Sequence, residues 1–311
     1  MERFLNPRND WMFKKIFGSE PNKDILIDLL NAVFDGTRQP IEDVVFLPTH
    51  QDPEIAALRQ TIVDVRCTDT DKNQFIVEMQ HYGDPFFIKR ACLYASRAYS
   101  IQLRRRDPNN KTKENLDVVY GDVKPVIFLA ILDTLSLIKG EDCISHNALL
   151  DIVTHANNIK EFSFSFIRLD KFNKTLDESE SLVDKWCYFF KNAETTEQED
   201  FEKIKKHWPL IGKAYDVLEV SNYTPEEYDK YCRHQMYADA HESCIWGARQ
   251  EGLAEGEAKG LAAGKAEGLA EGEAKKALET ATLMLAGGLQ ADVISQYTGL
   301  SIEEVQTLSK A

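Results

Sequence analysis

Two short apolar segments separated by a polar turn constrain the fold of this chain more than any other stretch. The first is Thr61–Cys67 (TIVDVRC) and the second is Gln74–Gln80 (QFIVEMQ), and both are rich in β-branched and apolar residues. The residues between them, Thr68–Asn73 (TDTDKN), are polar turn formers. This pattern predicts two antiparallel strands joined by a short loop.

The register of this hairpin decides which side chains meet. When the hairpin is folded about the middle of the turn, Val77 lies opposite Val65. Glu78 then lies opposite Asp64, and residues that face each other point to the same side, with Cβ atoms about 4.5–5.5 Å apart. Gln80 comes two residues after Glu78 and shares that side. A shift of one residue would separate the two carboxylates, so the prediction depends on this register.

Two facing carboxylates repel each other, and a bound cation removes that cost. Hard cations such as Mg²⁺ take oxygen ligands and are often held by one or two carboxylates together with substrate phosphates. Alternating apolar residues are expected to cover the opposite face of the hairpin: Val63, Val65, Val77 and Met79. The alternative is an amphipathic hairpin whose carboxylates are simply hydrated, and spacing alone leaves both open.

Apolar periodicity predicts further elements along the chain. Helices are expected at residues 9–18, Asp24–Phe34, Asp84–Arg105, Ala148–Ile159, Leu182–Asn192, Glu197–Val220 and Pro225–Trp246. Strands are expected at Glu42–Leu47, Lys124–Asp133 and Glu161–Leu169. Lys124–Asp133 has the strongest pattern of a buried strand and should lie centrally in the sheet.

Several segments of the sequence resemble one protein family. They are NDWMFKKIFG (Asn9–Gly18), IVDVRCTD (Ile62–Asp69), FIVEMQ (Phe75–Gln80), KRACLYASRAYS (Lys89–Ser100) and FIRLDKFNK (Phe166–Lys174). With the Gly/Ala/Glu repeat near the C-terminus, they resemble the recombination-promoting nuclease and transposase family of bacterial PD-(D/E)XK proteins. The resemblance implies an α/β fold: a restriction-endonuclease-like mixed sheet flanked by helices, with a helical extension and a long C-terminal helix.

The resemblance also implies an activity, that of a Mg²⁺-dependent DNA endonuclease with low sequence preference that promotes recombination or transposition. It assigns catalysis to Asp64, Glu78 and Gln80. The metal ligands would be Asp64 and Glu78, with Asp10 added from the first helix. Helix capping is the alternative role for Asp10, because a carboxylate near a helix start is favoured by the helix dipole.

Gln80 departs from the parent pattern, which has a lysine at this position. Glutamine can orient a water molecule by hydrogen bonds, but it carries no charge and cannot act as a base. The resemblance therefore implies that activation of the attacking water depends more on the metal and that turnover can be slow.

Basic residues after the hairpin are the predicted DNA contacts. One stripe of the helix expected at Asp84–Arg105 carries two guanidiniums and a phenol at i, i+4 and i+7: Arg90, Tyr94 and Arg97. In this fold that helix packs beside the hairpin, so Arg90 is expected to bind a phosphate bidentately. The helix ends in a basic cluster suited to the DNA backbone: Arg104, Arg105 and Arg106. Hydrated helix faces and ordinary salt bridges are the alternatives.

Charge is distributed unevenly along the 311 residues, whose net charge is −14. Residues 1–140 carry 19 Lys+Arg against 20 Asp+Glu, net −1, and the remaining residues carry 18 against 31, net −13. DNA binding requires a local basic surface rather than a basic total, so the near-neutral first part is compatible with it. The six cysteines form no CxxC pair, so no zinc site is expected.

Membrane and secretion signals are lacking in the sequence. No apolar run reaches the roughly 18–20 residues that span a bilayer. The first residues, MERFLNPRND, do not form an apolar signal segment. A cytoplasmic protein without membrane partners is therefore expected.

The sequence suggests four regions. Residues 1–175 are predicted as the nuclease-like core, 176–250 as a helical extension, 251–276 as a repeat helix and 277–311 as a small helical tail. The repeat reads GLAEGEAK, GLAAGKAE, GLAEGEAK, and each interior glycine costs about 1 kcal/mol relative to alanine. An extended, partly frayed helix is expected, with self-association into a homo-oligomer through the small residues as the alternative. Ser301 and Glu304 predict a capping box in the tail.

The sequence is compatible with three functions. A metal-dependent DNA endonuclease would require the metal and both carboxylates. A nuclease-fold protein that binds nucleic acid or a protein partner without cutting would keep binding after Asp64→Ala. A transposition accessory that acts as an oligomer would depend on the length of the repeat Gly252–Lys275.

Overall fold

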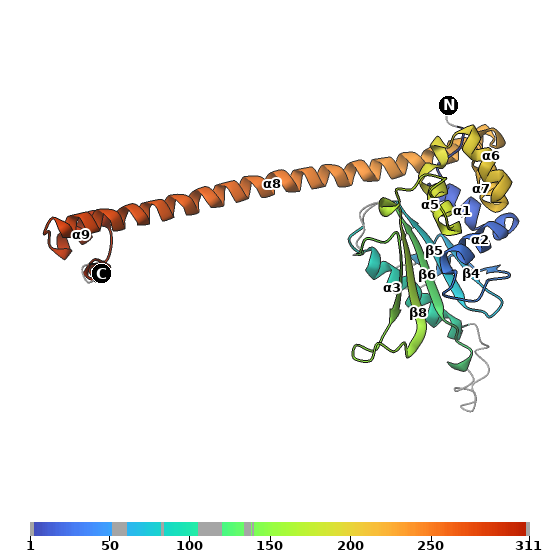
Figure 1. Ribbon diagram of the computed structural model, residues 1–311, viewed down its shortest axis with the longest axis horizontal. Helices are drawn as coiled ribbons and strands as arrows, with labels where there is room; N and C mark the ends of the chain where they lie inside the picture. The colour runs from blue at the N-terminus through green and yellow to red at the C-terminus, as the bar shows by residue number, and fades with distance from the viewer. Residues whose placement is uncertain are drawn as a thin grey trace. The chain divides into compact units, whose positions relative to one another are not determined.

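Two units make up the chain, Met1–Asp239 and Ala240–Ala311. The computed structural model describes residues 3–51, 61–81, 84–104, 120–133, 138 and 140–308. The first unit contains a mixed sheet flanked by helices (Figure 1), which confirms the predicted α/β class. Helix α8 (Pro225–Ala286) begins in the first unit and ends in the second, and it is the long C-terminal helix predicted from the sequence.

The main sheet of the first unit has the strand order β1-β4-β5-β6-β8-β7. Its central strands run parallel: β5 (Gln74–Gln80), β6 (Val126–Leu132) and β8 (Ile159–Arg168). Its outer strands are antiparallel to their neighbours: β1 (Val45–Phe46), β4 (Val65–Thr68) and β7 (Ile144–Leu149). A separate antiparallel pair consists of β2 (His50–Gln51) and β3 (Thr61–Ile62). All of β6 is buried between β5 and β8, which confirms the predicted central strand.

Helices cover both faces of the sheet (Figure 1). Helix α3 (Phe87–Arg104) lies on one face, where its buried alanines pack against Ile76 of β5 and Phe128 of β6. The other face carries α1 (Asp10–Phe17), α2 (Lys23–Phe34), α5 (Leu182–Asn192), α6 (Gln198–His207) and α7 (Pro209–Leu218). Successive residues of β5 alternate between the two cores, because side chains of a strand point to opposite faces.

Helices α5 to α7 belong to the same hydrophobic core as α1 and α2. Trp186 of α5 stacks edge-on against Phe17 of α1 at 5.7 Å between ring centroids. Trp186 also donates a hydrogen bond from Nε1 to the Asp28 carboxylate of α2 at 2.9 Å. These contacts fix α1, and with it the side chains that α1 presents near the hairpin.

The prediction of a helix at Ala148–Ile159 is wrong. This stretch is the end of β7, a turn and the start of β8. The Asp151 carboxylate accepts hydrogen bonds from the backbone N–H groups of Val153 and Thr154 at 2.9 and 2.7 Å, which closes the turn. The apolar residues Ile152 and Val153 of this stretch are 92% and 80% exposed, so they do not form the buried face that an amphipathic helix would have.

Two other helix predictions require correction. The single helix expected at Glu197–Val220 is divided into α6 and α7, because Pro209 begins α7 and cannot continue the preceding turn. The helix expected to end at Trp246 continues to Ala286, through the whole repeat. The helix Leu182–Asn192 has the predicted bounds.

The second unit consists of the later part of α8 with α9 (Ala291–Thr298) and α10 (Ile302–Leu308). Residues 251–276, which form the repeat, are exposed throughout. The two short helices pack on the end of α8 around a small cluster: Ala281, Ile294 and Val305. Glu304 Oε2 accepts from Ser301 N at 2.8 Å and Ser301 Oγ accepts from Glu304 N at 3.2 Å, so the predicted capping box is confirmed.

The four-region division and the self-association of the repeat stay predictions. Within the described ranges, no helix combines the length and the apolar content that a bilayer crossing requires.

Candidate functional site

Asp64 and Glu78 lie side by side at one end of the hairpin. Strands β4 and β5 pair with Val65 opposite Val77, which is the register predicted from the sequence. Asp64 directly precedes β4. At this position the two segments are joined by hydrogen bonds from backbone N–H groups to side-chain carboxylates, instead of by bonds between backbone groups. The Asp64 N–H donates to Glu78 Oε1 at 3.1 Å, and the Met79 N–H donates to Asp64 Oδ2 at 3.0 Å. Each carboxylate is therefore held by the backbone of the other strand.

A break in the strand before Asp64 makes this arrangement possible. β3 ends at Ile62 and β4 begins at Val65, so the intervening residues leave the regular strand. Val63 packs into the core under α3 rather than with Val65 on the opposite face. The prediction that Val63 shares the face of Val65 is therefore wrong, because strict alternation holds only within a continuous strand.

Burial controls the electrostatics of the two carboxylates. Glu78 is 8% exposed, and the side chain of Asp64 is 11% exposed. Burial, opposed by the charge of Lys14 and reinforced by that of Asp10, raises the pKa of Asp64 to about 6. Burial, followed by the charge of Asp64, raises the pKa of Glu78 well above its usual value. The pair is costly to ionise unless a cation is close.

Lys14 is a cation of this site that the sequence analysis missed. Its Nζ lies 3.2 Å from Asp64 Oδ1 and 2.7 Å from Asp10 Oδ1. Burial acts to lower the pKa of Lys14, but the charge of Asp64 and the hydrogen bond to Asp10 outweigh it, so the pKa is raised. The i, i+4 spacing of Asp10 and Lys14 on α1 was the available signal, since it puts both on one side of the helix.

Asp10 shares Lys14 with Asp64, its charge and side chain also act directly on Asp64, and half of its side chain is exposed. It does not cap α1. Asn9 does so, because its side chain accepts hydrogen bonds from the N–H groups of Trp11 and Met12. Asp10 is therefore not the capping residue, although it lies in the first turn of α1, where the helix dipole favours a carboxylate. Its role as a metal ligand stays a prediction.

Helix α3 brings Arg90 and Tyr94 to the same end of the hairpin. Arg90 Nη2 donates to Gln80 Oε1 at 2.9 Å, and Arg90 Nε lies 3.1 Å from Asp84 Oδ2. Burial raises the pKa of Tyr94, the charge of Arg90 opposes this, and the charges of Glu78 and Asp64 add to it. The salt-bridge alternative for Arg90 is thus present in the structure, and phosphate binding by the same guanidinium stays a prediction.

The other predicted DNA contacts lie further along α3 or beyond it. Arg97 is half-buried on α3, about two turns after Arg90. Arg104 is the last residue of α3, and Arg105 and Arg106 lie outside the described residues.

A second charged cluster supports the end of β5 and was not predicted from the sequence. Asp133, which follows β6, accepts from Arg8 Nη1 at 2.9 and 3.0 Å and lies 2.5 Å from His81 Nδ1. Burial acts to raise the pKa of Asp133, but the hydrogen bond from His81 and the charge of Arg8 hold it below its usual value. The Asp133 N–H also donates to the Gln80 carbonyl at 3.0 Å, so this cluster positions the backbone of Gln80.

The donor set can be tested against the Mg²⁺ ion that the resemblance implies. In the part of the chain that the structure describes, no group of three or more His, Cys, Asp or Glu is arranged to hold a metal. Two carboxylates are nevertheless a sufficient protein contribution for Mg²⁺, because water and substrate phosphates complete its coordination. Asp64 and Glu78 offer hard oxygen ligands, and a cation would remove the cost of ionising both. The residues present fit such an ion.

Comparison with known proteins places the chain in a family. The family model described as PD-(D/E)XK nuclease family transposase matches residues 7–248. No curated protein and no solved structure gave a significant match. The matched stretch contains the whole main sheet and both carboxylates of the hairpin. The fold and the match confirm the resemblance found in the sequence, and the chain belongs to the family of PD-(D/E)XK nuclease family transposases.

Proposed function

We propose that this protein is a metal-dependent DNA endonuclease that hydrolyses phosphodiester bonds with low sequence preference and thereby promotes recombination or transposition. The observation that carries the proposal is the pair of buried carboxylates, Asp64 and Glu78, each bonded to the backbone of the opposite strand at 3.1 and 3.0 Å. A structural role alone would not require two adjacent buried acids whose pKa values are both raised.

Asp64 and Glu78 would hold Mg²⁺ against the scissile phosphate. A bound Mg²⁺ polarises a phosphoryl oxygen and lowers the pKa of a bound water molecule. The protein holds the two carboxylates in place through backbone N–H groups, so neither has to move when the charge on the phosphate changes.

Lys14 supplies the positive charge that the parent pattern places at the position of Gln80. Its raised pKa keeps the ammonium charged at neutral pH, so it acts as an electrostatic stabiliser and not as a base. From its place 3.2 Å from Asp64, the ammonium can reach a phosphate oxygen held beside that carboxylate.

Gln80 and Arg90 form the second side of the proposed site. The hydrogen bond from Arg90 orients the Gln80 amide at the end of β5. A guanidinium at this place suits phosphate, which it can bind through two parallel hydrogen bonds. We assign DNA contact to Arg90, Tyr94 and Arg97 along α3, and to the cluster Arg104, Arg105 and Arg106.

Plasmid cleavage tests the proposal. Purified protein with supercoiled plasmid and Mg²⁺ should produce nicked and then linear DNA. Glu78→Gln keeps the shape of the side chain but removes a charged ligand. It should lower the rate on the order of a thousandfold, because metal binding supplies several kcal/mol of charge stabilisation. EDTA should abolish cleavage by the wild type. Equal cleavage by wild type and Glu78→Gln, both folded by circular dichroism, would overturn the proposal.

A second function is supported by Gln80, which lacks the charge of the lysine in the parent pattern. Such a protein would bind DNA through the same surface and cut it poorly or not at all. Fluorescence anisotropy with a labelled duplex separates the two functions. Binding without cleavage under any divalent metal would favour the binding module, whereas binding followed by metal-dependent cleavage favours the endonuclease.

A further inference from the structure

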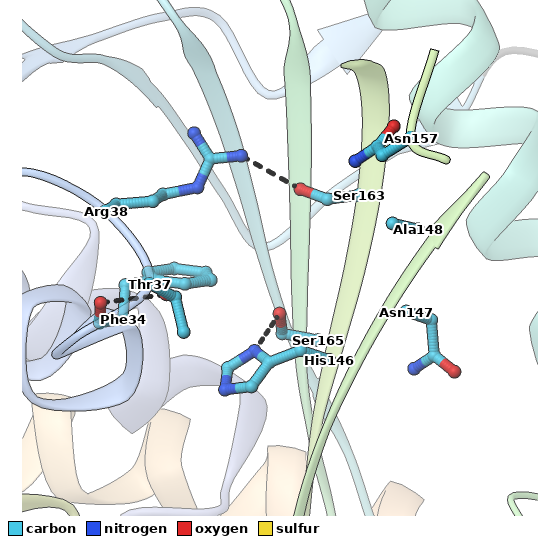
Figure 2. Close-up of a pocket in the computed structure, with 9 residues that line it drawn as sticks. All are labelled: Phe34, Thr37, Arg38, His146, Asn147, Ala148, Asn157, Ser163 and Ser165. Atoms are coloured by element: carbon cyan, nitrogen blue, oxygen red, sulfur yellow. Dashed lines mark hydrogen bonds between the residues drawn. The ribbon is translucent and has the colours of Figure 1, made fainter. Parts of the chain in front are cut away.

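A polar pocket lies apart from the carboxylate pair, between the end of α2 and strands β7 and β8 (Figure 2). Its volume is about 260 Å³, and neither Asp64 nor Glu78 lines it. We propose that this pocket binds a phosphate group, either as free phosphate or as a small phosphate monoester. The site is independent of the proposed endonuclease function, since it uses other residues.

Arg38 provides the positive charge of the pocket that a phosphate group requires. Its Nη2 donates to Ser163 Oγ at 3.1 Å, and its guanidinium lies 5.8 Å from the centre of the Phe34 ring. In the described ranges it forms no ion pair with a carboxylate. A guanidinium has five N–H donors in a planar fork that matches phosphate, and only one of them is bonded to a described residue.

The electrostatics of Arg38 favour an anionic ligand. Burial lowers the pKa of Arg38, and the charge of Asp69 opposes this without forming a contact. A half-buried cation without a neutralising contact is costly, and a bound anion would remove that cost.

Two serines form the floor of the pocket. Ser163 and Ser165 occupy alternate positions of β8, so both point to the face of the sheet that carries α1 and α2. Their partners on the neighbouring strand, Ile127 and Leu129, belong to the hydrophobic core of that face. From β6 to β8, the side chains on this face of the sheet therefore change from apolar to hydroxyl. The hydroxyl groups supply hydrogen-bond donors at a place where packing alone would favour an apolar residue.

His146 completes the polar wall. Its Nδ1 lies 2.9 Å from Ser165 Oγ, and Ser165 is 2% exposed (Figure 2). Burial, followed by the charge of Arg38, lowers the pKa of His146. The positive charge of Arg38 thus helps to lower the pKa of the imidazole. A phosphate bound to Arg38 would bring a negative charge close to the ring and raise this pKa.

The pocket volume limits the ligand. At about 260 Å³ the pocket is smaller than the roughly 300–1,000 Å³ of sites for drug-sized ligands. It fits phosphate alone or phosphate with a small organic group.

Calorimetry on the full chain tests the site, at pH 7.5 and constant ionic strength maintained with NaCl. The probes are inorganic phosphate, deoxyadenosine 5′-monophosphate and deoxyadenosine. We expect saturable binding of the first two and none of the third. Tighter binding of the nucleotide would identify a monoester as the ligand, whereas equal affinities would identify phosphate itself.

Matched variants locate the binding. Arg38→Gln should weaken it by roughly tenfold or more, because a charge-assisted hydrogen bond is lost. Arg233→Gln is the control, since Arg233 pairs with Asp229 on the surface of α8. Glu78→Gln should bind phosphate like the wild type, which separates this site from the carboxylate pair and from any failure of the endonuclease proposal.

The imidazole gives an independent readout. The His146 ring signals, titrated by NMR, should report a higher pKa with saturating phosphate than in chloride alone, and the difference should vanish in Arg38→Gln. The absence of saturable phosphate binding, or equal binding by wild type and folded Arg38→Gln, would overturn the proposal.

Discussion

The hairpin end and the repeat helix both carry acidic residues, but the two regions hold them in opposite environments. At the hairpin end, Glu78 is 8% exposed and bonded to the backbone of Asp64. In the repeat, Glu255 pairs with Lys259 at 2.6 Å on a helix surface where the two side chains are 67% and 75% exposed. The same kind of carboxylate is therefore a buried group with a raised pKa in one region and a hydrated surface group in the other.

The difference shows that burial, rather than residue type, creates the candidate site. A buried carboxylate near a second one resists ionisation and favours a cation. An exposed i, i+4 pair contributes only about 0.3–0.5 kcal/mol, because water screens both charges. Changes at the hairpin end should therefore alter both activity and stability, and changes in the repeat should alter little.

The largest effect after loss of Glu78 is expected at Lys14. Lys14→Gln should lower the rate of plasmid cleavage by about a hundredfold, because a charge that stabilises a phosphate contributes on the order of 2–4 kcal/mol to the barrier. Lys14→Arg, which keeps the charge, should lose less. The measurement is the single-turnover rate at saturating Mg²⁺.

Lys15→Gln is the control for Lys14. Lys15 follows it in α1 but pairs with Glu227 at 3.0 Å and lies over the ring of Trp11. Its loss should leave the cleavage rate within about twofold of the wild type, since it does not contact either carboxylate. Equal losses in Lys14→Gln and Lys15→Gln would show that Lys14 acts through the packing of α1 and not through its charge.

The stability of the metal-free protein should depend on pH through Asp64. Its pKa is about 6 in the folded protein against an ordinary value of 3.8. Between these values the folded state binds more protons than the unfolded chain, so the free energy of unfolding falls as the pH rises and stays lower above pH 6. Glu78 acts in the same direction.

Asp64→Asn removes this titration. At pH 7.5 in EDTA the variant should be more stable than the wild type by about 1–3 kcal/mol, although it should not cleave DNA. Urea unfolding between pH 4 and pH 8 measures the difference. A variant that is less stable at pH 7.5 would mean that the Lys14–Asp64 ion pair outweighs the cost of burial.

The repeat should respond to helix propensity alone. Apart from the backbone of the adjacent helical turns, a Cβ atom added at Gly256 or Gly264 meets no atom of the described residues within 4 Å. Each change to alanine should therefore stabilise the local helix by about 1 kcal/mol, which corresponds to roughly fivefold slower amide exchange. Hydrogen exchange of the full chain measures this, with plasmid cleavage unchanged. Faster exchange would indicate that the glycines make close contacts with another chain, as the self-association alternative requires.

Glu255→Gln should have the smallest effect and completes the comparison with Asp64→Asn. The free energy of unfolding should change by less than about 0.5 kcal/mol at any pH from 5 to 8, since the side chain is hydrated in both states. A change as large as that of Asp64→Asn would contradict the view that burial separates the two regions.

The elements that could be predicted from the sequence are those decided by local patterns. Alternating residues and a polar turn predicted the hairpin and its register, which the pairing of Val65 with Val77 confirms. A continuous apolar run predicted β6 as the central strand. Spacing also predicted α5 and the capping box of Ser301 with Glu304. The hairpin and the capping box are made by residues close together in the chain, and the apolar patterns of β6 and α5 mark these two elements as buried whichever segments they pack against, so the sequence by itself determined them.

The tertiary structure decided the features that join distant segments. No local pattern shows that Lys14 of α1 comes within 3.2 Å of Asp64, or that Arg38 and Ser163 share one pocket. The same limit explains the error at Ala148–Ile159, where apolar spacing suggested a helix but Ile152 and Val153 are exposed in a turn. Which side chains become buried together depends on how helices pack on the sheet, and burial in turn sets the charge state of Asp64 and Glu78.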